Sequence, residues 1–120
     1  MNSPARRRAE RKGQWAEAVA AILLQAKGYR ILERRFRSRA GEIDLIARRG
    51  KRLAFVEVKL RPVLSDAAWA VTPRQQARIA RAAEHWLAKN EVKGDFDVSF
   101  DVMAVVPWKW PRHIASAFRV

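Results

Sequence analysis

The sequence predicts a single α/β domain, residues 1–120, in which helices flank a mixed four-stranded sheet. Three observations support this prediction. Two segments have apolar residues at helical spacing, four are rich in strand-forming residues, and their order is helix, three strands, helix, strand. Because the last strand is reached through a helix, it should run parallel to its neighbour by a right-handed crossover. A chain of 120 residues is long enough to bury one real hydrophobic core.

The first helix is predicted to run from about Pro4 to Lys27. Ser3 fits an N-cap with proline at the first helical position, and Gly28 ends the helix. We expect residues 1–5 to be disordered. The apolar stripe expected to face the core is Trp15, Val19, Ile22, Leu23 and Ala26.

Three strands should follow this helix. Residues 29–36 alternate well enough for a strand with a basic, solvated face. A turn at Ser38–Gly41 leads into residues 42–48, and a second turn leads into residues 53–60. These last two segments have the composition of the two arms of a β-hairpin.

The second half of the chain begins with a proline-containing loop at 61–71. Thr72 and Gln75 fit a capping box for a helix that continues to about Lys89. Its buried face is expected to be Ile79, Ala83, Trp86 and Leu87.

The chain ends with a strand at 96–106 and a tail at 107–120 that should pack on the core. Two interpretations are open for Trp108 and Trp110 in this tail. They could cover the edge of the sheet, which we favour, or offer aromatic faces for unpaired bases to stack on.

The charge balance is strongly basic: 25 Lys and Arg against 12 Asp and Glu, a net charge of +13. Such a field attracts polyanions, and nucleic acid is the partner that it favours over an anionic membrane surface. Simple solubility is the alternative explanation. The absence of cysteine excludes disulfides and a thiol nucleophile. With no visible signal peptide, we expect a cytoplasmic protein without a membrane partner.

Arginines and lysines with the placement needed for phosphate contacts occur along the whole chain. The expected nucleic-acid-binding residues are Arg7, Arg8, Arg11, Lys12, Arg37, Arg61, Arg74, Arg78 and Arg81.

Carboxylates are scarce in this chain, yet three of them lie in the apolar hairpin. A four-residue turn at Arg49–Arg52 would pair Arg48 with Leu53. Asp44 then lies directly opposite Glu57, with Cβ atoms only about 4.5–5.5 Å apart. Such a pair should have raised pKa values or attract a cation.

The next pair along the same face is Glu42 opposite Lys59. Mg²⁺ or Mn²⁺ would suit the carboxylates, with Asp44 and Glu57 as ligands. Lys59 beside the ion could stabilise charge on a phosphate or orient an attacking water. The alternative is a surface cluster of ion pairs in which Lys59 neutralises the two glutamates.

Two further polar residues are candidates for the same site. Glu17 is the one charged residue between Lys12 and Lys27, and it could reach the metal from the first helix as a third carboxylate. A solvated glutamate is the simpler reading of Glu17 taken alone. Gln76 lies on the inward side of the second helix and could donate a hydrogen bond in the site, or simply pack there.

The spacing of Asp44 and the Glu57-Val58-Lys59 run resembles the PD-(D/E)xK nuclease superfamily, although Ile43 stands where that motif has proline. The segments GYRIL, GEIDLIA, FVEVKLR, FDVMAV and HIASAF resemble the bacterial UPF0102, or YraN-like, family across nearly the whole chain. Within the superfamily, the chain is most similar to archaeal Holliday-junction resolvases, which also place a glutamate on the first helix.

This resemblance implies a restriction-endonuclease-like fold, metal ligands at Asp44 and Glu57, a catalytic Lys59 and a helix-borne Glu17. It also implies that Glu42 orients Lys59 and that a homodimer is possible. The expected function is a metal-dependent endonuclease, a hydrolase acting on structured or branched nucleic acid, DNA rather than RNA. A non-catalytic nucleic-acid-binding module that retains the nuclease fold is the alternative.

Overall fold

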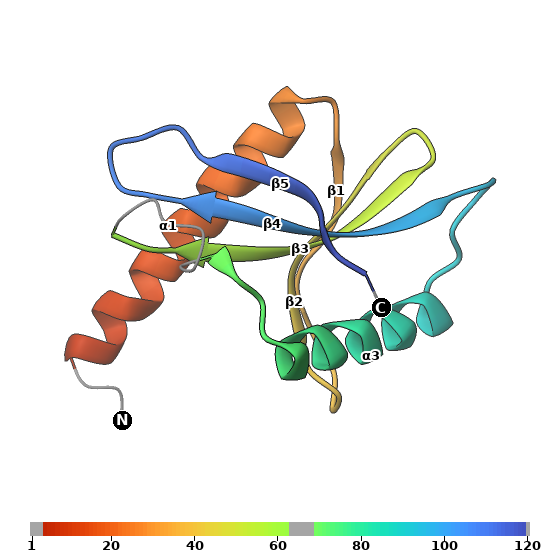
Figure 1. Cartoon of the computed structure of the whole chain (residues 1–120), viewed down its shortest axis with the longest axis horizontal. Helices are drawn as coiled ribbons and strands as arrows, with labels where there is room; N and C mark the ends of the chain where they lie inside the picture. Colours follow the sequence, from red (N-terminus) through yellow and green to blue (C-terminus); the bar gives the residue numbers. More distant parts are fainter. Residues whose placement is uncertain (1–3, 63–68, 120) are drawn as a thin grey trace.

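The computed structural model describes residues 4–62 and 69–119, with side chains of the first helix from Gly13 onward. Two helices and five strands are described in this part of the chain (Figure 1). In chain order they are α1 (Pro4–Ala26), β1 (Arg30–Arg37), β2 (Glu42–Arg49), β3 (Arg52–Leu60), α3 (Pro73–Lys89), β4 (Asp97–Val105) and β5 (Arg112–Phe118).

The strands form one mixed sheet in the order β1-β2-β3-β4-β5. β3 and β4 are parallel, as the helical connection predicts, and the other neighbours are antiparallel. The core residues of β2 alternate between the two helices: Leu45 and Ala47 pack with α1, whereas Ile46 packs with α3. The helices therefore cover opposite faces of the sheet, and the predicted α/β class is confirmed (Figure 1).

The buried face of α1 agrees with the predicted stripe only in part, since Val19 and Leu23 are partly buried against the core. Trp15 is 47% exposed and Ile22 is 65% exposed, whereas Ala20 and Leu24 are fully buried. Small alanine side chains let the helix axis approach the sheet closely, so the face richest in alanine packs against it. Glu17 lies beside this alanine face, and the rotation of the helix brings Glu17 toward the sheet.

Helix α3 agrees with the sequence prediction at its start. The Thr72 side chain accepts a hydrogen bond from the Gln75 N–H, and the Gln75 side chain accepts one from the Thr72 N–H. The expected inward residues Ile79, Ala83 and Trp86 are buried, and Leu87 is partly buried. Ala82 joins them on the same face.

The hairpin register is the predicted one. Arg48 pairs with Leu53, and Arg49 pairs with Arg52 at the end of the ladder. Gly50 in the turn has a φ of 58°, a left-handed conformation that glycine adopts without steric cost. The turn therefore sets which side chains of β2 and β3 lie opposite each other.

The tail differs from the prediction, because it contributes a fifth strand. β5 pairs with β4 and closes the edge that we expected the tryptophans to cover. Trp108 is 100% exposed and Trp110 is 87% exposed, so neither side chain packs on the sheet. The backbone of β5, not the indole rings, completes this side of the fold.

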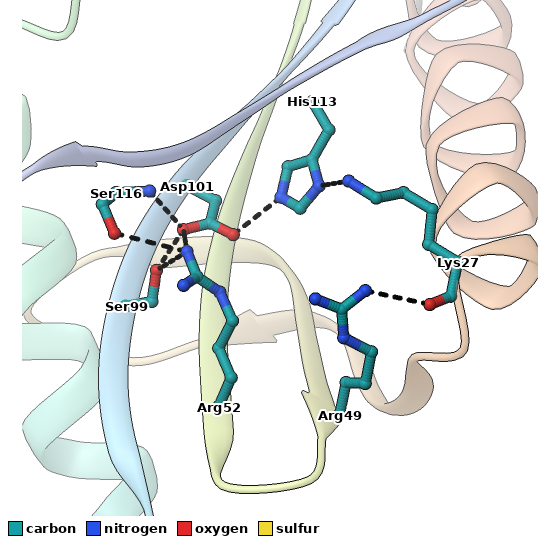
Figure 2. A network of polar contacts seen from close by, with 7 residues as sticks. All are labelled: Lys27, Arg49, Arg52, Ser99, Asp101, His113 and Ser116. Carbon is teal, nitrogen blue, oxygen red and sulfur yellow. Dashed lines mark hydrogen bonds and ion pairs between the residues drawn. The ribbon is translucent and has the colours of Figure 1, made fainter.

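A buried polar network holds β5 in place (Figure 2). Asp101 on β4 is fully buried, and its Oδ2 accepts a hydrogen bond of 2.7 Å from Nε2 of His113. Its Oδ1 accepts hydrogen bonds from the Ser116 N–H at 2.9 Å and from Arg52 at 3.2 Å. Lys27 contacts the other ring nitrogen of His113, which ties the end of α1 to the same group. His113 is thus an internal hydrogen-bonding residue.

Burial alone would raise the pKa of the Asp101 carboxyl group. The hydrogen bonds from His113, Ser99 and Ser116, together with the charge of Arg52, outweigh that effect and lower its pKa below the usual value. The network is therefore built around an ionised carboxylate that stabilises the folded state.

Candidate functional site

The site is built where β2 and β3 stop pairing through their backbones. Their paired residues extend as far as Leu45 and Val56. Beyond that point, Oδ2 of Asp44 accepts a hydrogen bond of 2.8 Å from the Val58 N–H. A side chain of β2 thus satisfies a backbone donor of β3, which fixes the orientation of the Asp44 carboxylate.

Glu57 lies next to Val58 on β3, and its carboxyl group interacts strongly with Asp44. Burial raises the pKa of Glu57 to about 7, and the negative charge of Asp44 adds to this shift. Burial also raises the pKa of Asp44 to about 6, against the opposing effect of the Val58 hydrogen bond. Two half-buried carboxyl groups therefore oppose each other's ionisation, as a cross-strand pair would.

Lys59 follows on the same strand and is only 5% exposed. Its ammonium charge lowers the pKa of Glu57, which places the two groups within electrostatic reach of each other. Within the described part of the chain, the Lys59 side chain makes no hydrogen bond or ion pair. The ammonium group of a lysine whose side chain is largely buried beside carboxylates is suited to bind an anionic group brought into the site.

Glu17 on α1 belongs to the same neighbourhood, since its charge raises the pKa of Asp44. Its Oε2 accepts a hydrogen bond of 2.8 Å from Nε of Arg35 on β1. Its Oε1 is buried and has no hydrogen-bond partner among the described residues. Arg35 has a φ of 52°, so the ion pair rests on a strained residue of β1.

Two predicted site residues are engaged elsewhere. Glu42 is exposed and lies 3.7 Å from Arg37 as an ion pair, although its charge still raises the pKa values of Asp44 and Glu57. Gln76 donates a hydrogen bond of 2.8 Å to the Val71 carbonyl oxygen, which holds the start of α3. Glu42 therefore lies at the exposed edge of the predicted site. Gln76 has a structural role at the start of α3 and makes no described contact with the carboxylates.

The residues present fit a small divalent cation. Among the described side chains, those of residues 13–62 and 69–119, no three acidic or histidine groups are already arranged around one point. Mg²⁺ does not require that arrangement, because it binds through one or two carboxylates and keeps several waters. Asp44 and Glu57 supply such a pair, and the buried Oε1 of Glu17 is an additional oxygen without a partner.

A hollow of about 380 Å³ lies at the α1 side of this group. Glu17 and Glu42 line it together with Arg35 and Arg37. Arg61 is also near the group, since its charge lowers the pKa of Glu57. Arg74, Arg78 and Arg81 are exposed along α3. The predicted contacts Arg7, Arg8, Arg11 and Lys12 lie outside the described side chains.

Gly41 explains how the start of β2 is positioned. A Cβ atom at this residue would lie 3.1 Å from the carbonyl oxygen of Arg78 on α3. Any other residue would press its Cβ against the helix backbone, so glycine suits this close approach of the turn before β2, and Glu42 and Asp44 follow soon after it.

No described helix has the length and apolar content needed to cross a membrane.

Comparison with known proteins agrees with the segments quoted above. The model of a family described as "Uncharacterised protein family UPF0102" matches residues 16–105. A UPF0102 protein of Bradyrhizobium diazoefficiens is 53% identical over 116 residues, covering 97% of this chain and 87% of that protein. One from Rhodopseudomonas palustris (strain BisB18) is 55% identical over 116 residues, covering 97% and 86%. One from Parvibaculum lavamentivorans is 51% identical over 111 residues, covering 92% and 84%.

Proposed function

The chain belongs to the UPF0102 family, and from that premise we propose that it is a metal-dependent endonuclease. It would hydrolyse phosphodiester bonds in structured or branched nucleic acid, with DNA favoured by the resemblance to Holliday-junction resolvases. One observation carries this proposal. Asp44 and Glu57 are held together at the end of the β2–β3 ladder with raised pKa values, and a buried lysine lies beside them.

Such a pair is costly for a protein that does not use it. Each unit by which burial raises a carboxyl pKa corresponds to about 1.4 kcal/mol against the ionised form. A divalent cation offsets this cost, because it favours both carboxylates in their charged state. Clustered groups with mutually perturbed pKa values are also typical of catalytic sites.

Each residue of the site has a distinct role in the proposed reaction. Asp44 and Glu57 would hold Mg²⁺ or Mn²⁺, with the free oxygen of Glu17 close by. The bound ion would lower the pKa of a water and neutralise charge on the phosphate. Lys59 would donate a hydrogen bond to a phosphate oxygen or orient the attacking water. Arg35 holds Glu17 in position.

The positive charge of the chain supports a nucleic-acid substrate. Phosphate contacts by arginine and lysine give affinity without reading the sequence. Arg37 lines the hollow at Glu17 and Glu42, and the exposed arginines of α3 add further positive charge to the surface. A polyanionic strand would therefore be drawn toward the carboxylate group by the surrounding cations.

A second function, binding nucleic acid without cleaving it, is favoured by one specific observation. Glu17 and Glu42 are each already paired with an arginine, at 2.8 Å and 3.7 Å. Carboxylates that are already neutralised by arginine have less need of a metal ion, as expected for a surface that binds nucleic acid without cleaving it.

The two functions separate in one experiment. Purified protein is incubated with labelled four-way-junction, duplex and single-stranded DNA in Mg²⁺, Mn²⁺ or EDTA. We expect cleavage that requires the metal and is lost in Asp44→Asn and in Lys59→Ala. Asp95→Asn and Lys93→Ala, at exposed positions, are the matched controls and should cleave normally.

Calorimetry with Mn²⁺ on the same proteins identifies the alternative. A binding module would bind DNA with the usual salt dependence, would take up no Mn²⁺, and would be unaffected by Asp44→Asn. Cleavage that survives both Asp44→Asn and Lys59→Ala would overturn the nuclease proposal.

A further inference from the structure

A groove of about 670 Å³ lies beyond the end of β3, with a volume typical of ligand-binding sites. Its walls come from three parts of the chain: α1, the residues that follow β3, and the turn between β4 and β5. A second hollow of about 420 Å³ shares two of its residues and extends toward the end of that turn. The first groove is lined by Trp15, Leu60, Arg61, Pro62, Pro107 and Trp108.

Three tryptophans define this surface, and all of them are exposed. Trp15 is about half exposed, whereas Trp108 and Trp110 are almost wholly in solvent. Aromatic side chains normally bury most of their large apolar area, and a patch that does not is typical of an interaction site. We call the surface formed by Trp15, Trp108 and Trp110 the tryptophan groove.

The backbone of Trp108 supplies a second, independent observation. The Lys109 N–H donates a hydrogen bond of 3.3 Å to the Val106 carbonyl oxygen, which closes a turn with Pro107 at its second position. Trp108 occupies the third position with a φ of 64°, where glycine or asparagine is favoured.

A bulky residue such as Trp108 is strained in this conformation. Because its side chain is fully exposed, no burial of apolar surface offsets the strain. Strain held at one exposed residue indicates that the side chain serves something outside the fold. A glycine would make the same turn at lower cost, so the indole ring is the part of the residue that matters.

The charges around the groove identify the kind of partner. Arg61 and Lys109 line the two hollows together with the tryptophans, and none of the described lining residues is acidic. In a symmetric dimer formed by this surface, each patch would face its own copy and bring these cations together. A single nucleic-acid strand offers what the groove lacks: flat rings to stack on indoles and phosphates for the cations.

Arg61 joins the groove to the carboxylate group. It lines the groove, and its charge also acts on Glu57. We infer that the tryptophan groove binds unpaired bases of a single-stranded or branched nucleic acid next to the carboxylate site. The position of the scissile phosphate in this scheme rests on the proposed function, whereas binding of the bases does not.

The test measures binding without cleavage, in EDTA, with labelled oligothymidine and a blunt duplex of the same length. We expect oligothymidine to quench tryptophan fluorescence. Since each stacked base contributes about 1–3 kcal/mol, the double variant Trp108→Ala, Trp110→Ala should lose roughly tenfold or more in affinity for it. Affinity for the duplex should change less than about twofold. Trp108→Phe, which keeps an aromatic face, should retain most of the binding.

Two controls separate binding from structure. Ile22→Ala removes an exposed apolar side chain outside the groove and should leave both affinities unchanged. Trp108→Gly should keep or raise the melting temperature, because it relieves the positive φ, while still weakening oligothymidine binding. If the melting temperature of Trp108→Gly falls by several degrees, the Trp108 side chain stabilises the fold, and the inference is overturned.

The remaining outcomes are also decisive. Equal loss of single-strand and duplex binding in the double variant would show that the groove does not recognise unpaired bases. A wild-type dimer in light scattering that becomes monomeric in the double variant would assign the groove to self-association instead. If no DNA is cleaved but the tryptophan-dependent binding is found, the nuclease proposal fails and this inference stands. If cleavage is found with no tryptophan dependence of binding, the inference alone fails.

Discussion

The carboxylate of Asp44 accepts the backbone hydrogen of Val58 at 2.8 Å, so a side chain completes the hydrogen bonding between β2 and β3. This contact orients one oxygen of Asp44 toward the strand and leaves the other for the site. It also makes the effect of a substitution depend on whether the new side chain can still accept a hydrogen bond.

Asp44→Asn should preserve the fold and abolish metal binding. The amide oxygen can still accept from Val58, while the negative charge next to Glu57 is gone. In EDTA at neutral pH we therefore expect a higher melting temperature than for the wild type. Asp44→Ala leaves the Val58 N–H without its partner and should be about 1–3 kcal/mol less stable than Asp44→Asn. Thermal melts with and without Mn²⁺ measure both effects, and an unchanged Mn²⁺-induced shift in Asp44→Asn would contradict the assignment of this ligand.

Stability in EDTA should fall as the pH rises through the range in which Asp44 and Glu57 ionise. The folded pKa values are raised to about 6 and about 7 from usual values of 3.8 and 4.5. Between these limits the folded state binds more protons than the unfolded state, so the free energy of unfolding decreases with pH. The stabilisation is complete below about pH 4 and lost above about pH 7.

The double variant Asp44→Asn, Glu57→Gln lacks this effect and isolates it from all other titrations. Relative to that variant, the wild type should lose on the order of 3 kcal/mol for each of the two carboxyl groups across the window, measured by urea unfolding in EDTA. Adding Mg²⁺ at neutral pH should restore most of the loss. A difference that stays constant with pH would show that the two carboxyl groups do not have raised pKa values.

The buried carboxylate of Asp101 should have the opposite pH dependence. Its folded pKa is lowered, so its contribution is present above the usual value of 3.8 and is lost as the pH falls through the folded pKa. Asp101→Asn leaves His113 and Arg52 without their charged partner and should cost about 3 kcal/mol in the free energy of unfolding. Asp97→Asn, exposed on the same strand, is the control. Hydrogen exchange should show β5 losing protection first, and uniform loss across the sheet would argue against a local role for the network.

Gly41→Ala should destabilise the protein, because the new Cβ would lie 3.1 Å from the Arg78 carbonyl oxygen. Displacing the turn from α3 should cost about 1–3 kcal/mol, measured by urea unfolding, and should weaken Mn²⁺ binding through Glu42 and Asp44. Gly13→Ala is the matched control. Nothing lies within 4 Å of its Cβ position in α1, so alanine should stabilise the helix by about 0.5–1 kcal/mol.

The hairpin was predictable because turn length and strand alternation fix a register once both strands are assigned. The α1 face was not predictable in the same way. Residues 13–26 are apolar nearly all round, so periodicity supports two faces, and weighting by side-chain size selects Trp15 and Ile22. Packing selects the alanines instead, since their size allows close approach to the sheet. The same rotation turns Glu17 from an apparently solvated residue into a neighbour of Asp44.

The missed partners share a different cause. Arg35 lies 18 residues from Glu17, and Asp101 lies 12 residues from His113. Nothing in local sequence pairs a helix with the strand after it, or one strand with the next, at the level of single side chains. One signal for β5 was present, because Ile114 and Phe118 are an even number of positions apart and share one face of an extended segment. Pro107 and Pro111 led us to predict an irregular tail. In the structure, both prolines lie in the connection that precedes β5.

Because of the order in which the strands are connected, the carboxylate pair and the tryptophan groove should form at different stages of folding. The carboxylate pair comes from two strands joined by a tight turn, so its contacts are short in sequence and can form as soon as the hairpin does. The tryptophan groove joins α1 to the turn after β4, and it closes only when almost all of the chain has been assembled. During synthesis, the carboxylate pair of Asp44 and Glu57 would therefore form well before the tryptophan groove.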